Sequence, residues 1–137
     1  MAANTRMATA VQILCVIAYK GPERSNAEVV ASSLRTNPVV VRRLLKCLEQ
    51  EGLVEIYPGK DGGVQLARDP GQITLDQIYQ AVETDAGVFA LRPNGNPTCP
   101  VNKWMKDLLT PIFGAAETAV ETTLRRTTLG SLVETIG

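Results

Sequence analysis

Apolar side chains recur every three or four positions through the first half of the chain, which is the period of amphipathic helices. From this pattern we predict three short helices, over residues 5–19, 25–34 and 38–51. One face of the third helix is apolar and consists of Val41, Leu44, Leu45 and Leu48. Asn37 and Pro38 are typical of a helix start, and Gly52 is typical of the position after a helix end. The third helix therefore has defined limits and a side that faces a core.

Two short polar patterns indicate further helix starts. Residues 25–28 form a capping box, in which we expect the Ser25 side chain to cap the second helix and Glu28 to bond back to it. Thr74 and Gln77 repeat this pattern at the start of a helix that ends near residue 82.

The hydrophobic period becomes strand-like after Gly52. Residues 53–57 and 64–67 flank a glycine-rich loop, which predicts a β-hairpin. Residues 84–99 are rich in turn-forming residues, and a long helix over 100–126 and a short one over 129–136 follow. The predicted fold is mainly α with a small β-hairpin: a winged helix-turn-helix plus a long C-terminal dimerisation helix.

The long helix over residues 100–126 carries an apolar stripe that the rest of so small a chain cannot cover. We therefore expect a homodimer joined through this helix. The chain divides into a winged helix-turn-helix DNA-binding domain (1–83), a loop that is a candidate sensor region (84–99), and the dimerisation helix with the short C-terminal helix (100–137).

The third helix also predicts a DNA-binding surface. Opposite its apolar face lie Val39, Arg42, Arg43 and Lys46. In helix-turn-helix proteins the first half of this helix meets base edges in the major groove, where arginine binds guanine and an apolar side chain touches the thymine methyl. The alternative is a solvated basic face on an ordinary helix, and the preceding capped helix and following hairpin favour DNA contact.

Three further residues are candidate phosphate contacts. Lys60 stands at the tip of the hairpin loop, whose glycines let the backbone approach DNA. Thr5 and Arg6 precede the first helix, whose free N–H groups suit a phosphate. The alternatives stay open: the glycines serve only the turn, and Thr5 serves only as a helix cap.

Composition narrows the function class. The 137 residues carry 14 basic and 14 acidic side chains, with a net charge of +3 in residues 1–68 and −3 in residues 69–137. Aromatic residues make up 4%, too few for stacking platforms, and no histidine is present. Without histidine or a phosphate-binding loop, an enzyme is not expected. No segment predicts a membrane span or a signal peptide, so we expect a cytoplasmic protein that does not contact membranes.

Several motifs together resemble the IscR/NsrR/CymR family of winged-helix regulators. The matching segments are Thr5-Arg6, Glu51-Gly52-Leu53-Val54, Gly62-Gly63-Val64, Leu66-Ala67-Arg68, Ile73-Thr74-Leu75, Cys99-Pro100-Val101 with Trp104, and Thr128-Leu129-Gly130-Ser131-Leu132. The resemblance covers nearly the whole chain. It implies a homodimer on a dyad-symmetric operator, with base contacts from Asn37, Val39 and Arg42. The family's wing arginine falls on Pro58, and Lys60 is the candidate substitute.

Some members of that family bind an iron–sulfur cluster through three cysteines in the loop before the long helix. Only Cys99 of that set is present, so we expect no iron–sulfur cluster and no other cofactor. Cys99 itself is the candidate redox or effector residue, because a helix N-terminus favours a thiolate. The alternative is that Cys99 is a small cap residue without a sensing role. Cys15 and Cys47 are expected to behave as small core residues.

The function predicted from these observations is a sequence-specific transcriptional regulator, with repression as the expected mode. Its expected partners are double-stranded DNA, a second copy of the chain, and a small-molecule or redox effector. The alternative is a winged-helix module for protein–protein or RNA contact without operator specificity.

Overall fold

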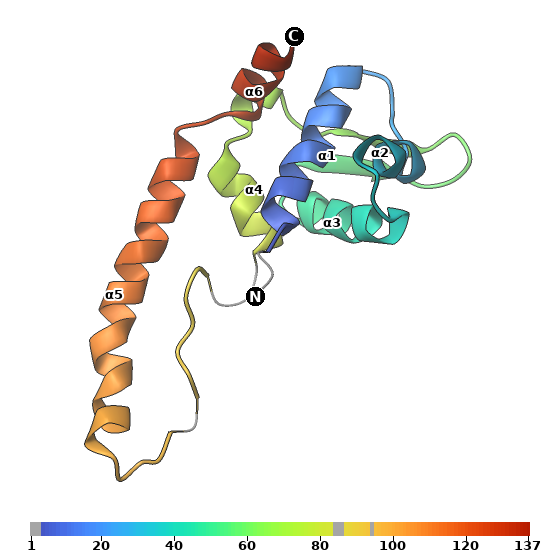
Figure 1. Cartoon of the computed structure of the whole chain (residues 1–137). Helices are drawn as coiled ribbons and strands as arrows, with labels where there is room; N and C mark the ends of the chain where they lie inside the picture. Colours follow the sequence, from blue (N-terminus) through green and yellow to red (C-terminus); the bar gives the residue numbers. More distant parts are fainter. Residues whose placement is uncertain (1–3, 84–86, 94) are drawn as a thin grey trace.

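The computed structural model describes residues 4–83, 87–93 and 95–137 (Figure 1). The helices and strands are α1 (Arg6–Lys20), α2 (Ala27–Leu34), α3 (Pro38–Gln50), β1 (Val54–Tyr57), β2 (Gly63–Leu66), the 3-10 helix η1 (Pro70–Gln72), α4 (Leu75–Val82), α5 (Pro100–Arg125) and α6 (Leu129–Ile136). A compact unit of short helices lies to one side, and α5 extends away from it (Figure 1). This is the predicted winged helix-turn-helix fold with a long C-terminal helix.

The core lies between α1, α3 and α4. Its fully buried side chains include Ile13, Leu14, Ile17, Leu48, Leu53, Ile73 and Ile78. The apolar face predicted for α3 is buried as expected. Asn37 caps α3 by accepting a 2.8 Å hydrogen bond from the Val39 N–H, and Pro38 occupies the first turn. Packing and capping thus set α3 with one side inward and the other free.

The hairpin forms the wing. β1 and β2 are antiparallel, with Val54 opposite Leu66 and Tyr57 opposite Gly63. Gly63 has φ +134°, and a Cβ there would lie 2.5 Å from the Ser25 carbonyl oxygen. Only glycine lets the hairpin approach the segment before α2 so closely.

The prediction that Ser25 caps α2 is wrong. The cap is Asn26, whose side-chain oxygen accepts a 2.8 Å bond from the Val29 N–H. Ser25 instead pairs with Val64, through Ser25 N–H to Val64 O at 2.9 Å and Val64 N–H to Ser25 O at 2.6 Å. This pairing with the wing holds Ser25 extended, so α2 starts later than predicted.

The C-terminal segment returns to the compact unit. α6 packs against α1 and η1, and Leu129 is fully buried in the same core as α1. Thr128 caps α6 by accepting a 3.1 Å bond from the Ser131 N–H. In the part of the chain that the structure describes, no helix combines the length and apolar character that a bilayer span requires.

Candidate nucleic-acid interface

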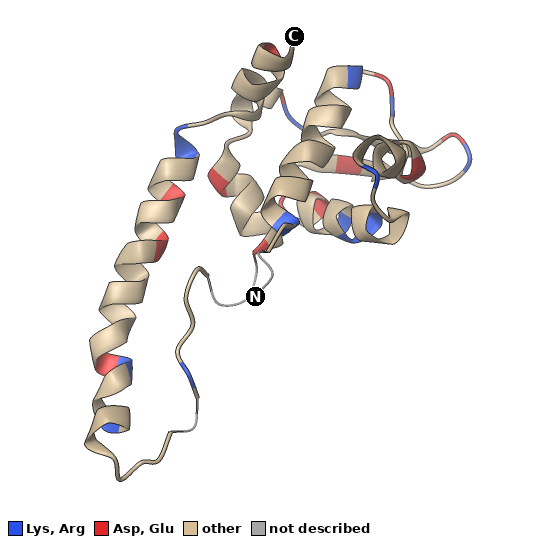
Figure 2. Ribbon diagram, in the orientation of Figure 1, with Lys and Arg blue, Asp and Glu red and all other residues tan. Residues whose placement is uncertain are grey.

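The free side of α3 is exposed and basic. Val39, Arg42, Arg43 and Lys46 are all exposed, and Val39 is 52% accessible. Blue segments mark these basic positions along α3 in Figure 2. No ion pair involves Arg43 or Lys46 within the described residues. The structure therefore brings the four predicted residues of α3 together on one surface.

Asn37 lies at the start of this surface, and its capping role limits which of its side-chain groups can bind DNA. Its side-chain oxygen is occupied by the Val39 N–H. Its amide NH₂ group remains as a hydrogen-bond donor. Asn37 can therefore donate to a base acceptor or to a phosphate oxygen while it still caps α3.

Arg42 forms an ion pair with Glu28 of α2, through its Nη2 atom and the Glu28 Oε1 atom. Their side chains are 54% and 60% exposed, so the pair lies open to solvent. A guanidinium group has five N–H donors, and one carboxylate oxygen engages only part of them. Arg42 therefore keeps N–H donors free while it is paired with Glu28.

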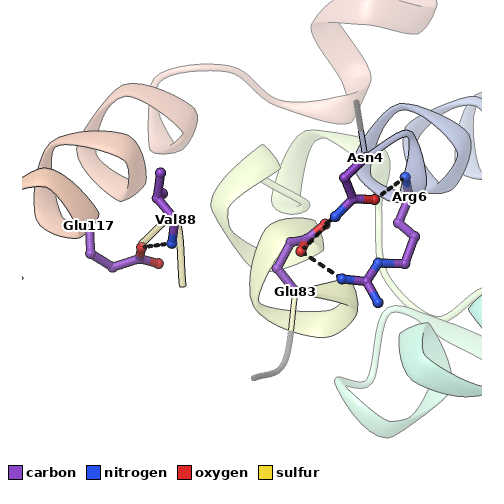
Figure 3. A network of polar contacts seen from close by, with 5 residues as sticks. All are labelled: Asn4, Arg6, Glu83, Val88 and Glu117. Atoms are coloured by element: carbon purple, nitrogen blue, oxygen red, sulfur yellow. Dashed lines mark hydrogen bonds and ion pairs between the residues drawn. The ribbon is translucent and has the colours of Figure 1, made fainter. Parts of the chain in front are cut away.

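Thr5 and Arg6 lie at the start of α1. Arg6 belongs to a polar network with Asn4 and Glu83 (Figure 3). The Arg6 Nη2 atom lies 3.0 Å from Glu83 Oε2, and the Asn4 side-chain amide donates to the same carboxylate at 2.9 Å. Thr5 is exposed and its side chain forms no capping bond. A phosphate bound at the start of α1 would therefore contact Arg6 while Arg6 is paired with Glu83.

The wing is anchored by an arginine outside the predicted set. The Arg24 guanidinium lies 3.6 Å from the centre of the Tyr57 ring and donates to the Asp61 carbonyl at 3.3 Å. The Tyr57 hydroxyl donates to Glu55, which raises the pKa of Tyr57. Lys60 lies exposed in the loop that Arg24 holds, next to Asp61.

The C-terminal half of α5 is attached to α4 by polar contacts. Arg125 Nε donates to Asp76 at 3.1 Å, and Gln80 donates to Glu121 at 2.7 Å. Burial disfavours ionisation of Asp76, but its bonds with Thr74 and Arg125 outweigh this and lower the pKa of the carboxyl group.

Tyr79 lies within the same contact between α4 and α5. Burial is the main cause that raises the pKa of Tyr79 to about 12, and the Glu117 carboxylate beside it adds to the rise. The phenol therefore loses its proton only in more alkaline solution than an ordinary tyrosine does.

Two residues of the linker, Val88 and Phe89, also contact α5. Glu117 accepts a 2.8 Å bond from the Val88 N–H (Figure 3), and the rings of Phe89 and Phe113 lie 5.3 Å apart. The other side of α5 has no such cover from the described residues. Val101, Trp104, Leu108 and Ile112 are each more than half exposed there.

The three cysteines occupy different surroundings. Cys99 is partly exposed at the N-cap of α5 and makes no side-chain capping bond. Cys15 and Cys47 pack against the core of the compact unit. Burial raises the pKa of the Cys15 thiol, which disfavours its reactive thiolate.

Comparisons with known proteins agree with this geometry. A family model described as Rrf2, iron-dependent transcriptional regulator, matches residues 3–135. The "Putative HTH-type transcriptional regulator YwnA" of Bacillus subtilis is 36% identical over 121 residues, 88% of this chain and 89% of that protein. The crystal structure of a putative DNA binding protein has a TM-score of 0.74 at 32% identity, over 93% of this chain and 97% of that one. The global cysteine regulator CymR of B. subtilis shares the fold, with a TM-score of 0.68 at 21% identity over 98% and 97% of the two chains.

The iron in the family's description can be tested against the donors that this chain offers. Residues 84–99 contain one cysteine, Cys99, and the sequence has no histidine. Cys15 and Cys47 belong to helices of the compact unit. The described residues include no group of three acidic, cysteine or histidine side chains placed to hold a metal ion. This donor set does not fit a cluster held by three thiolates of the linker.

Two residues that accompany the interface were not predicted from sequence. The capping box predicted for Glu28 is wrong, because the Ser25 N–H donates to Val64 instead, and the sequence pattern predicts no role for Arg24. Both act on residues distant in sequence, since Glu28 pairs with Arg42 and Arg24 stacks on Tyr57. The only signal in the sequence is a charged residue just before or inside α2, which does not identify its partner.

Proposed function

The chain belongs to the Rrf2 family of transcriptional regulators, and on this premise we propose that it binds a dyad-symmetric operator as a homodimer and represses transcription. It is a DNA-binding regulator and not an enzyme. We place its action in the cytoplasm, where it reaches the chromosome. A dimer seated on an operator near a promoter would exclude RNA polymerase.

The observation that carries the proposal is the exposed side of α3. It places one apolar and three basic side chains on one surface, and a helix of this width fits the major groove. In our proposal Arg42 contacts guanine, Val39 contacts a thymine methyl, and Asn37 donates to a neighbouring acceptor. Arg43, Lys46 and Lys60 contact phosphates.

The homodimer is supported by the uncovered side of α5. Its four large apolar side chains are spaced three or four residues apart, so they form one stripe along the helix. A second copy of α5 offers a matching apolar surface, and a two-fold interface uses the same patch on both chains. Two α3 helices related by that axis would meet half-sites about one helical turn apart.

The proposed function is tested by selecting bound fragments from genomic DNA at physiological salt. We expect a symmetric motif, bound far more tightly than a shuffled duplex of the same composition. The affinity should fall steeply as salt rises, because bound phosphates release counterions. Binding without sequence preference would instead support the alternative, a winged-helix module for RNA or protein contact. A reporter gene behind the recovered motif tests repression.

Lys60→Ala is expected to weaken binding to all duplexes and to flatten the log–log salt slope by about one unit per half-site, since one phosphate contact is lost. The measurement is fluorescence anisotropy with the selected and shuffled duplexes over a salt series. Lys20→Ala, in the last turn of α1, is the matched control and removes the same charge. Equal slopes for Lys60→Ala and the control would mean that the wing tip does not touch DNA.

We propose that Cys99 is the residue through which a redox effector acts. Hydrogen peroxide would oxidise the Cys99 thiol to a sulfenic acid and be reduced to water. The oxidised group at the start of α5 would shift this helix and change the spacing of the two α3 helices. We expect peroxide to weaken operator binding by the native protein and to leave Cys99→Ser unaffected. Equal responses of the two proteins, or no response, would assign Cys99 a structural role.

A further inference from the structure

The ion pair between Glu28 and Arg42 joins α2 to the surface of α3 proposed to bind DNA. Glu28 is not needed to cap α2, because the Asn26 side chain already accepts from the Val29 N–H. The pair is also too exposed to contribute much to the stability of the fold. The pair is distinguished by its position, because its cation, Arg42, is the residue that we propose contacts guanine.

A carboxylate in this position has two effects on Arg42. It restrains a long side chain that otherwise samples many rotamers, and so directs the remaining N–H donors outward from α3. It also compensates the charge that attracts phosphates. Phosphate attraction is independent of sequence, whereas a bidentate contact with guanine depends on donor geometry. Glu28 thus weakens the first interaction and keeps the second.

We propose that Glu28 is a positioning residue that determines operator specificity through Arg42. This inference rests on the proposed function, in which α3 binds the operator. In the free protein Glu28 holds the guanidinium at Nη2, and in the complex it continues to do so while the other donors meet the base. The Glu28 carboxylate also repels the phosphates of DNA, and on a sequence without the guanine no base contact of Arg42 offsets this repulsion.

The test compares Glu28→Gln with the native protein on two duplexes, one with the selected motif and one with the same bases shuffled. We expect the shuffled duplex to bind about threefold more tightly per half-site, because a repulsive charge is removed. Binding to the motif should not gain, so the ratio of the two affinities falls by about tenfold in the dimer. Glu49→Gln is the matched control. It removes the same charge, and Glu49 lies exposed at the far end of α3. It should leave the ratio unchanged.

A second variant separates positioning from a general charge effect. In an Arg42→Ala background, Glu28→Gln should no longer change the ratio, because the side chain that it positions is absent. Thermal unfolding of each variant checks that the fold is kept. If Glu28→Gln leaves the native ratio intact, or changes it equally with and without Arg42, the inference is overturned. If the native protein shows no preference for the motif, the proposed function itself fails.

Discussion

Leu108→Glu is expected to convert the proposed homodimer into a monomer at micromolar concentration. Leu108 is 52% exposed in the single chain and lies between Trp104 and Ile112 on the uncovered stripe of α5. In a two-fold dimer the substitution places two carboxylates, one from each chain, in an apolar interface, where charges without partners are strongly disfavoured. Sedimentation analysis measures the change directly.

Operator affinity should fall with the dimer. A monomer holds one half-site, and it loses the high effective concentration that a joined second domain has at the other half-site. The expected loss is about 10²- to 10⁴-fold. Thr110→Glu is the matched control, because Thr110 is exposed on the opposite side of the same helix. A native-like dimer formed by Leu108→Glu would show that the interface lies elsewhere.

Local features of the fold were predictable because neighbouring residues determine them. The buried face of α3 follows from the spacing of Val41, Leu44, Leu45 and Leu48, and its start follows from Asn37 and Pro38. The capping box of α4 was likewise predicted, and there Gln77 accepts from the Thr74 N–H at 3.2 Å. In each case the partners lie within one or two turns of the same helix.

Features that depend on contacts between distant segments were not predictable. The local pattern predicts that Ser25 is a helix cap, but its backbone pairs with Val64 of the wing. Arg6 and Glu83 are 77 residues apart, and nothing in their own neighbourhoods links them. An exposed cation looks equally free in sequence whether or not the fold supplies a carboxylate. The residues of the α3 surface were therefore predicted, but the pairing of Arg42 with Glu28 of α2 was not.

Arg42→Ala is expected to abolish most of the preference for the operator while leaving the fold intact. Loss of a bidentate contact with guanine costs about 1–3 kcal/mol in each half-site, and the dimer has two half-sites. The expected loss on the selected motif is therefore about 2–6 kcal/mol, or roughly 30-fold to 10⁴-fold in affinity. The shuffled duplex should lose less, because it offers no guanine placed for the bidentate contact and loses only the attraction of one charge to phosphates.

Lys46→Ala is the comparison that gives this result its meaning. Lys46 is exposed one turn further along α3, and its loss removes the same charge from the same surface. As a phosphate contact it should weaken binding to both duplexes alike, whereas Arg42→Ala should affect chiefly the selected one. Equal losses on both duplexes for Arg42→Ala would make Arg42 a phosphate contact as well. The melting temperature should change little in either variant, because Arg42 and Lys46 are both exposed. Glu28 is exposed too, and it stays hydrated when Arg42 is removed.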